Sequence, residues 1–369
     1  STVISDLENA PPGILIWRAL LQWMGGIGII VTAVVILPLL QVGGMQLFRI
    51  ESSDASEKVL PRTAQIAGAI SIIYLSLSMI CAFVYWAAGM PAFEAAAHSM
   101  STIATGGFST SDLSIGVYDS ALIDYTAVVF MIIGSLPFLL YFQTLRGQPL
   151  ALWQDSQVRW FFSILVAAVG CMVLYQVGEN GLPIDKAIRY TVFNVTSILT
   201  GTGYTTDDYG QWGGFAVVMF FFVMFIGGCA GSTSCGIKIF RFQVLYAAAR
   251  SQMSRLLQPH GVFVANFNRR PIPESVMDSV MSFFFLFILS FAVMAVALSF
   301  MGLDFITAVS GAGTAIANVG PGLGNVIGPS GTFAPLPDMA KWLLALGMLL
   351  GRLEVLTVLV LFTRAFWRS

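Results

Sequence analysis

The stretch Ser101-Thr-Ile-Ala-Thr-Gly-Gly-Phe-Ser-Thr110 follows a short apolar segment, and similar stretches occur at two later places in the chain. These are Ser197-Ile-Leu-Thr-Gly-Thr-Gly-Tyr-Thr-Thr206 and Thr314-Ala-Ile-Ala-Asn-Val-Gly-Pro-Gly-Leu323. When the three are aligned on Gly107, Gly203 and Gly320, a hydroxyl residue lies six positions before each glycine. The intervals between the glycines are long enough for two membrane spans and a shorter segment. The chain is therefore predicted to be a concatenation of similar units.

The composition indicates a protein embedded in lipid. Hydrophobic residues make up 57% of the chain and charged residues 10%, against about 25% charged residues in soluble proteins. A net charge of −1 argues against a partner bound by bulk attraction, such as nucleic acid. The four cysteines lie in apolar stretches and there are only two histidines, which disfavours a disulfide scaffold or a zinc site. We therefore expect an all-α integral membrane protein.

The apolar stretches fall into two length classes. Since a membrane-spanning helix needs about 20 apolar residues, seven stretches are predicted to cross the bilayer: 13–40, 64–88, 122–143, 160–177, 213–246, 276–301 and 338–363. Three others are too short and are predicted to be half-spans, each leading into one of the repeated stretches: 91–103, 183–198 and 303–316.

The positions of the basic residues predict the orientation. Lys and Arg are concentrated in the connections 41–62, 144–159 and 237–272, whereas 1–12, 104–121, 199–212 and 318–337 contain none. By the positive-inside rule the basic connections face the cytoplasm, with the N-terminus outside and the C-terminus inside. The first twelve residues do not have the pattern of a signal peptide. Acidic residues of the outer connections either concentrate cations or are solvated loop residues: Asp112, Asp119, Asp207 and Asp208.

Non-helical backbone at membrane depth is tolerated where it lines a watery cavity, and carbonyl oxygens there can replace the water around a cation. Glycine allows the backbone torsions that this requires, and the negative C-terminal end of each half-span favours a cation. Ordinary turns are the alternative, which three similar copies disfavour. The predicted ion-binding residues are Thr105, Gly106, Gly107, Gly201, Thr202, Gly203, Asn318, Val319 and Gly320.

Two further features point to control of such a pore. The run 227–236 has four glycines and three hydroxyl residues in the middle of an apolar segment. It is poor helix-forming sequence and is predicted to be a loop within the membrane, the alternative being a kinked packing helix. Arg352 lies in the predicted span 338–363, where a charge is costly unless it faces a cavity or a partner. A salt bridge with Glu354 is the alternative interpretation, but residues two apart on a helix do not share a face.

Other charged and aromatic residues receive structural interpretations. Lys186 and Arg189 accompany the second half-span, where they could bind Asp185 or help to shape the electrostatic field near the pore, and the structural role is favoured. Arg18 is predicted to extend toward the outer membrane surface. The run Phe283-Phe284-Phe285 is predicted to face lipid.

The chain resembles the Trk/Ktr/HKT superfamily of potassium transporters, most closely the bacterial TrkH/TrkG-type potassium uptake subunit. The residues that carry the resemblance are the three repeated stretches, Arg18-Ala-Leu-Leu-Gln-Trp-Met-Gly-Gly-Ile-Gly28, Gly227-Gly-Cys-Ala-Gly-Ser-Thr-Ser-Cys-Gly-Ile-Lys238 and Gly351-Arg-Leu-Glu354. The resemblance implies four pseudo-symmetric, potassium-channel-like repeats, a homodimer, and a cytoplasmic TrkA-type nucleotide-binding ring as partner. It also implies gating by Arg352 and by an intramembrane loop with Gly227, Gly228, Gly231, Ser232, Thr233 and Gly236. Ser234-Cys235 stands where the family usually has two glycines, so this loop is expected to be stiffer.

The resemblance divides the chain into repeats. The resemblance identifies the three repeated stretches as filter loops, where a complete chain would have four. Residues 1–42 would then be the second span of an incomplete repeat 1, since the chain is expected to begin just after the first filter loop. The other three repeats are 43–146 with filter loop 104–110, 147–256 with filter loop 200–206 and gating loop 227–236, and 257–369 with filter loop 318–323.

These features predict the pore-forming subunit of a potassium uptake system in a bacterial inner membrane, with K⁺ as the transported ion. No catalytic residues and no cofactor are expected, since no nucleophile–base pair or phosphate loop is found. A sodium or mixed-cation transporter of the same superfamily is the first alternative. An ion-coupled secondary carrier, which would have inverted repeats, is the second.

Overall fold

The computed structural model describes residues 2–32, 59–268, 270–353, 358 and 367. Most of the described chain is helical, and its one two-stranded pair is β1 (Asn266–Phe267) with β2 (Arg270–Pro271). The long helices are α1 (Pro12–Val31), α4 (Val59–Ala87), α9 (Ser156–Gly178) and α13 (Glu274–Phe300), and all four are long and apolar enough to cross a membrane. The expectation of a multi-pass, all-α membrane protein is confirmed.

The predicted span 122–143 is not one straight helix. It forms α6 (Ala121–Ser135) and α7 (Phe138–Leu145), which are bent by 90° at the break between them. Pro137 lies in this break and has no N–H to continue the helical hydrogen bonds. If the bent pair counts as one span, the described residues contain five candidates rather than the predicted seven.

One other predicted span also differs from the structure, and two extend beyond the described residues. The segment 213–246 forms α11 (Gly214–Val223) and the start of α12 (Ile239–Leu257), separated by non-helical chain that includes the predicted 227–236 loop. The last predicted span begins with α16 (Asp338–Arg352), and 33–40 of the first and most of 354–363 lie outside the described residues.

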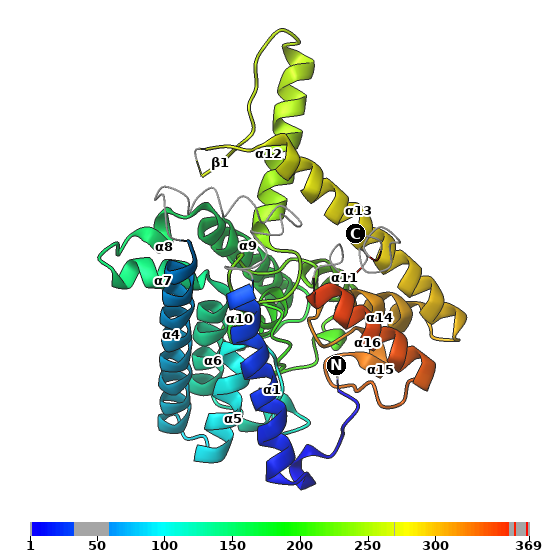
Figure 1. The fold of residues 1–369 in the computed structure, drawn as a ribbon. Helices are drawn as coiled ribbons and strands as arrows, with labels where there is room; N and C mark the ends of the chain where they lie inside the picture. The colour runs from blue at the N-terminus through cyan, green and yellow to red at the C-terminus, as the bar shows by residue number, and fades with distance from the viewer. Residues whose placement is uncertain (1, 33–58, 269, 354–357, 359–366, 368–369) are drawn as a thin grey trace.

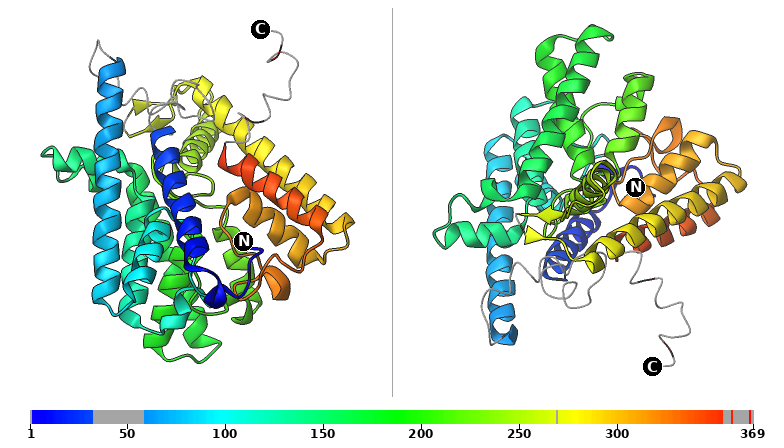
Figure 2. Two further views of the ribbon diagram at one scale, coloured as in Figure 1. Left: turned by 60° about the horizontal axis from the view of Figure 1, so that its bottom comes forward. Right: turned by 90° about the horizontal axis from the view of Figure 1, so that it is seen from above.

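The three predicted half-spans are short helices: α5 (Ala92–Ile103), α10 (Ile184–Leu199) and α14 (Phe305–Ala317). Each packs between other helices: α5 against α1, α4 and α6, α10 against α9, α6 and α11, and α14 against α13 and α16. Figure 1 and Figure 2 show α1 between the α4–α5–α6 group and the α13–α14–α16 group. This order of long helix, short helix, loop and helix occurs three times in the described chain.

The remaining elements are short connections or lie at the ends of the long helices. They are the 3₁₀ helices η1 (Leu7–Asn9), η3 (Ser114–Tyr118) and η4 (Tyr209–Gln211), and the one-turn helices α8 (Ala151–Gln154) and α15 (Gly324–Ile327). Helix α12 and the β1–β2 pair project from the body of the molecule (Figure 1).

Burial separates the interior of the bundle from its outer faces. Phe161, Phe193 and Phe220 are fully buried around α10, whereas Phe83 and Phe300 are exposed on long helices and are available to lipid. The prediction that the run at 283–285 faces lipid is wrong for Phe283, which is 4% exposed and lies 3.7 Å from the Arg241 guanidinium. Phe285 is 66% exposed, as expected.

Candidate functional site

The three short helices end in the same way. In each, the carbonyl of the repeated hydroxyl residue accepts a hydrogen bond from the N–H five residues later: Ser101 from Gly106, Ser197 from Thr202, and Thr314 from Val319, at 2.8 to 3.1 Å. A second bond joins the next residue's carbonyl to the N–H three residues later, at Thr102–Thr105, Ile198–Gly201 and Ala315–Asn318. This pair of bonds is the Schellman motif, which closes the C-terminus of a helix. The spacing seen in the sequence is therefore the spacing of a helix end.

The backbone torsions of the three loops also match. The first and third residues of each predicted ion-binding triplet have positive φ: Thr105 and Gly107, Gly201 and Gly203, Asn318 and Gly320. Asparagine and glycine adopt this region readily, but a β-branched residue such as Thr105 adopts it only at a cost. Glycine also permits close approach between loops, since a Cβ on Gly107 would lie 1.9 Å from the Thr202 carbonyl oxygen. A Cβ on Gly203 would lie 2.4 Å from the Val319 oxygen.

Eight of the nine predicted ion-binding residues line a single cavity of about 550 Å³. The exception is Gly201, where a Cβ would meet the Cβ of Cys235 at 2.8 Å. Loops from three distant parts of the sequence thus meet around one space, with the C-terminal ends of α5, α10 and α14 behind them. The partial negative charge of helix C-termini favours a cation at such a place.

Tyr204 joins two of these loops, a role that the sequence analysis missed. Its hydroxyl contacts the carbonyl oxygens of His98 at 3.2 Å and Phe108 at 3.4 Å, and the hydroxyl of Thr102 at 3.4 Å. The Ser197 hydroxyl donates to the Tyr204 carbonyl at 2.6 Å. An aromatic residue directly after a repeated glycine was the available signal in the sequence. Its partners, about a hundred residues away, could not be read from it.

The acids of the outer connections have structural partners. Asp112 accepts from the backbone N–H groups of Asp6 and Leu7, and Asp207 accepts from the Trp212 indole at 2.7 Å. Asp208 caps the following turn at Gly210. At the N-terminal segment, a hydrogen bond from the Ser111 hydroxyl lowers the pKa of Glu8. These carboxylates fasten the outer segments to one another.

Arg189 has a structural role, as predicted, but with other partners than Asp185. Its Nε atom lies 2.7 Å from the carboxylate of Asp124, whose side chain is 2% exposed, and its Nη2 atom lies 3.0 Å from Asp119. Helices α10 and α6 are thereby joined by an ion pair that is closed to solvent on the Asp124 side.

Arg189→Ala is expected to lower the free energy of unfolding by about 3 kcal/mol, because it leaves the Asp124 carboxylate buried and unpaired. The measurement is thermal unfolding of the purified protein in detergent. Lys341→Ala is the control. Lys341 forms an ion pair with Asp338, whose side chain is exposed, so the loss of this pair should lower the free energy of unfolding by no more than about 1 kcal/mol. Equal changes in the two variants would contradict the assignment.

Backbone N–H groups of the 227–236 loop donate hydrogen bonds to residues of three helices, α6, α9 and α14. Cys229 N–H donates to the Ser135 carbonyl at 3.0 Å and Thr233 N–H to Gly134 at 3.1 Å, both at the break between α6 and α7. On the other side of the loop, Gly236 N–H donates to the Ala317 carbonyl at the end of α14 at 2.8 Å. Ala230 N–H donates to the side chain of Gln157 on α9 at 3.0 Å. The loop is thus packed in place, and the break between α6 and α7 supplies two of the carbonyl oxygens that it binds.

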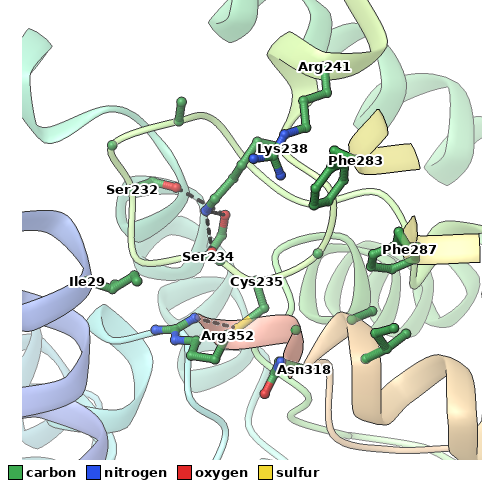
Figure 3. Close-up of a pocket in the computed structure, with 16 residues that line it drawn as sticks. Ile29, Ser232, Ser234, Cys235, Lys238, Arg241, Phe283, Phe287, Asn318 and Arg352 are labelled. Atoms are coloured by element: carbon green, nitrogen blue, oxygen red, sulfur yellow. Dashed lines mark hydrogen bonds between the residues drawn. The ribbon is translucent and has the colours of Figure 1, made fainter. Parts of the chain in front are cut away.

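Arg352 lies at the end of α16, against this loop. Its Nη1 atom is 3.0 Å from the Cys235 sulfur (Figure 3). The same atom is 3.5 Å from the Thr233 carbonyl oxygen. Cys235, Asn318 and Arg352 line both the large cavity and a smaller one of about 50 Å³. A fixed positive charge therefore lies between the two spaces. Glu354, the alternative partner of Arg352, is outside the described residues.

The smaller cavity is lined on its other side by Ser232, Ser234, Lys238 and Arg241. The Lys238 ammonium donates to the Ser234 carbonyl and lies 3.3 Å from the Ser234 hydroxyl (Figure 3). Lys238 thus ties the end of the 227–236 loop to the first residues that follow it.

Arg18 does not extend to the membrane surface as predicted. It is 5% exposed, and its guanidinium lies 4.3 Å from the centre of the Phe108 ring, beside the large cavity. The prediction was wrong because depth along a helix indicates nothing about which loop covers that helix.

Comparison with known proteins gives a consistent result. A family model described as TrkH, a cation transport protein, matches residues 1–369. The Trk system potassium uptake protein TrkI of Halomonas elongata is 48% identical over 370 residues, which cover all of this chain and 75% of the relative. TrkH of Escherichia coli K12 is 40% identical over 376 residues, covering all of this chain and 77% of the relative. The crystal structure of the potassium transporter TrkH from Vibrio parahaemolyticus superimposes with a TM-score of 0.91 at 39% identity, covering all of this chain and 76% of that one.

Proposed function

This chain belongs to the TrkH family of cation transport proteins, and from that premise we propose that it is the pore-forming subunit of a potassium uptake system in a bacterial inner membrane. The observation that carries the proposal is the convergence of three loops with the same helix-end geometry on one cavity. The named potassium uptake relatives support potassium as the ion.

The proposed path runs from the outer face through the large cavity and past the 227–236 loop to the cytoplasm. Loop carbonyls would replace part of the hydration shell of K⁺, with the ends of α5, α10 and α14 contributing negative potential. Next to this cavity lie the 227–236 loop and Arg352, which we propose as the gate. The residues Gly227, Gly228, Gly231, Ser232, Thr233 and Gly236 would form its movable part.

The experiment that tests the function is cation uptake into liposomes containing the purified protein. K⁺ uptake driven by its own gradient should exceed Na⁺ uptake by about tenfold or more, the equivalent of about 1.4 kcal/mol. Protein-free liposomes are the control. Equal K⁺ and Na⁺ uptake would favour the mixed-cation alternative, and uptake that requires a second ion gradient would favour the coupled carrier.

The Thr233 hydroxyl is the contact through which we propose that the gate is held closed. It lies 2.9 Å from the Ile103 carbonyl oxygen at the end of α5 and 2.8 Å from the Gly134 carbonyl oxygen on α6. It also accepts from Thr105, a predicted ion-binding residue, at 3.2 Å. One hydroxyl of the 227–236 loop therefore contacts the end of α5, the end of α6 near its break with α7, and a residue that lines the large cavity.

Thr233→Val keeps the shape of this side chain and removes its hydrogen bonds. We expect K⁺ uptake to rise about fivefold, because a lost hydrogen bond weakens the closed arrangement by roughly 1 kcal/mol. The measurement is the initial rate of ⁸⁶Rb⁺ or K⁺ uptake in the same liposomes. Thr144→Val is the matched control, since among the described residues the Thr144 hydroxyl bonds within its own helix, to Leu140 at 2.9 Å. A rate in Thr233→Val no higher than in Thr144→Val would contradict the proposal that the Thr233 hydroxyl holds the gate closed.

The proposal also includes the assembly that the resemblance implies, a homodimer on a cytoplasmic TrkA-type nucleotide-binding ring. The basic connection 237–272 and the projecting α12 support the assignment of this end of the molecule to the cytoplasm.

A further inference from the structure

The stretch Arg18–Gly28 on α1 lies beside the large cavity. Arg18, Gln22 and Gly26 are four residues apart and therefore lie on one face of the helix. All three contact the loop 104–110 or its immediate neighbours. Helix α1 thus presents a stripe of three residues to a single one of the three loops.

Gln22 is the centre of this contact. Its Nε2 atom donates to the Gly106 carbonyl oxygen at 2.6 Å, and its Oε1 atom accepts from the Ser101 hydroxyl at 2.7 Å and from the Phe108 N–H at 3.1 Å. The amide therefore binds one residue before the pair Gly106–Gly107, one residue of the pair and one residue after it. Gly106 is needed for this approach, because a Cβ there would lie 2.3 Å from the Gln22 Cδ atom.

The neighbouring contacts hold α1 rigidly at this place. A Cβ on Gly26 would meet the Tyr74 hydroxyl at 2.6 Å and the Ala104 Cα at 3.1 Å, so glycine allows α1 to approach both. The Tyr74 hydroxyl donates to the Trp23 carbonyl, and the Trp23 indole donates to Ser78, both at 2.9 Å. Since α1 is fastened to α4, the Gln22 amide has a fixed position relative to the loop.

The contact makes one carbonyl of the cavity unlike its counterparts. Gly106, Thr202 and Val319 are the middle residues of the three triplets, and all three line the cavity. Within the described residues, a side-chain donor reaches the Gly106 oxygen, whereas the Thr202 and Val319 oxygens lie against Gly107 and Gly203 of the adjacent loops. A carbonyl that accepts a short hydrogen bond has its direction fixed and less freedom to turn toward a small ion.

We propose that Gln22 is a positioning residue that sets cation selectivity by holding the Gly106 carbonyl in place through its side-chain amide. This rests on the proposed function. The smaller Na⁺ requires carbonyls that move inward, so a fixed carbonyl disfavours Na⁺ relative to K⁺. Gln22 does not itself need to touch the ion.

The test compares Gln22→Met, which keeps the length of the side chain and removes all three hydrogen bonds, with Gln22→Glu. The glutamate can still accept from Ser101 and Phe108 but cannot donate to Gly106. The readout is the ratio of K⁺ to Na⁺ uptake in liposomes. Both variants should lower this ratio about fivefold or more, while total cation uptake persists. Gln65→Met is the control, a glutamine exposed on α4, and should keep the ratio of the unmodified protein.

An unchanged ratio of K⁺ to Na⁺ uptake in either Gln22 variant would overturn the inference. If the melting temperature of that variant also fell, Gln22 would have a structural role alone. Failure of the proposed function would look different, since the unmodified protein would then show no K⁺ uptake. Selective uptake by the unmodified protein together with an unchanged ratio in Gln22→Met would reject only the role of Gln22.

Discussion

Gly203→Ala should reduce K⁺ uptake by about 100-fold, the equivalent of about 2.7 kcal/mol in the barrier to permeation. The reason is geometric: a Cβ at this position would lie 2.4 Å from the Val319 carbonyl oxygen and 2.9 Å from the Pro321 ring. Both neighbours belong to the adjacent loop, so the added atom must push two walls of the cavity apart. Gly203→Asp adds a carboxylate at the same place and should be at least as severe. The measurement is K⁺ and Na⁺ uptake in liposomes.

A matched control separates this collision from the strain of the backbone. Gly147 also has positive φ, +96° against +82° for Gly203, but a Cβ there would meet nothing within 4 Å. Gly147→Ala therefore carries a similar backbone penalty of roughly 1 kcal/mol without the contact, and its K⁺ uptake should stay near that of the unmodified protein. Intact and selective uptake in a folded Gly203→Ala protein would refute the assignment of these loops to the ion pathway.

The sequence predicted the three short helices and their loops because the signals for them are local. A helix end needs a residue that accepts positive φ and a fixed spacing to the last carbonyls, and glycine or asparagine stands at the required place in two of the three copies. The remaining copy, the first along the chain, has Thr105 at this position, and the conformational preference of threonine alone would not predict it there. Its recognition depended on the similarity to the other two stretches.

The bend between α6 and α7 could not be predicted in the same way. Hydropathy treats 122–143 as one apolar run, and a single proline is compatible with a mild kink. The 90° bend is matched to a partner far away in sequence, because Phe138 N–H donates to the Gly231 carbonyl at 3.0 Å. The bend and the 227–236 loop satisfy each other's backbone groups, so neither is determined without the other.

Arg18 and Arg189 illustrate the same limit for charged side chains. From the position of Arg18 near the start of a span, its side chain was expected to extend to the membrane surface. From proximity in sequence, Asp185 was expected to be the partner of Arg189. The observed neighbours are the Phe108 ring and the Asp124 carboxylate. Each is brought near by packing between helices that are separated by many residues, which is information that a single sequence does not carry in its local pattern.

Arg352→Ala should raise K⁺ uptake about tenfold or more. Arg352 lines both cavities together with Cys235 and Asn318, so an ion that passes between the two spaces must pass its guanidinium. At an effective dielectric constant of about 20, two positive charges about 4 Å apart repel by roughly 4 kcal/mol. Removal of the charge lowers this barrier. It also removes the contacts of Arg352 with Cys235 and with Thr233 of the loop.

Two further variants show which of these effects acts. Arg352→Gln removes the charge and keeps most of the length, so it should reproduce the rise if electrostatic repulsion is the cause. Arg352→Lys keeps the charge but lacks the planar guanidinium, so uptake should stay low if repulsion is the cause and should rise if the contact with the loop is what closes the path. Unchanged or lower uptake in Arg352→Ala, with a melting temperature like that of the unmodified protein, would show that the residue is not a barrier. In that case the Thr233 contacts with Ile103 and Gly134 would have to account for closure alone, and Thr233→Val would then give the larger rise of the two.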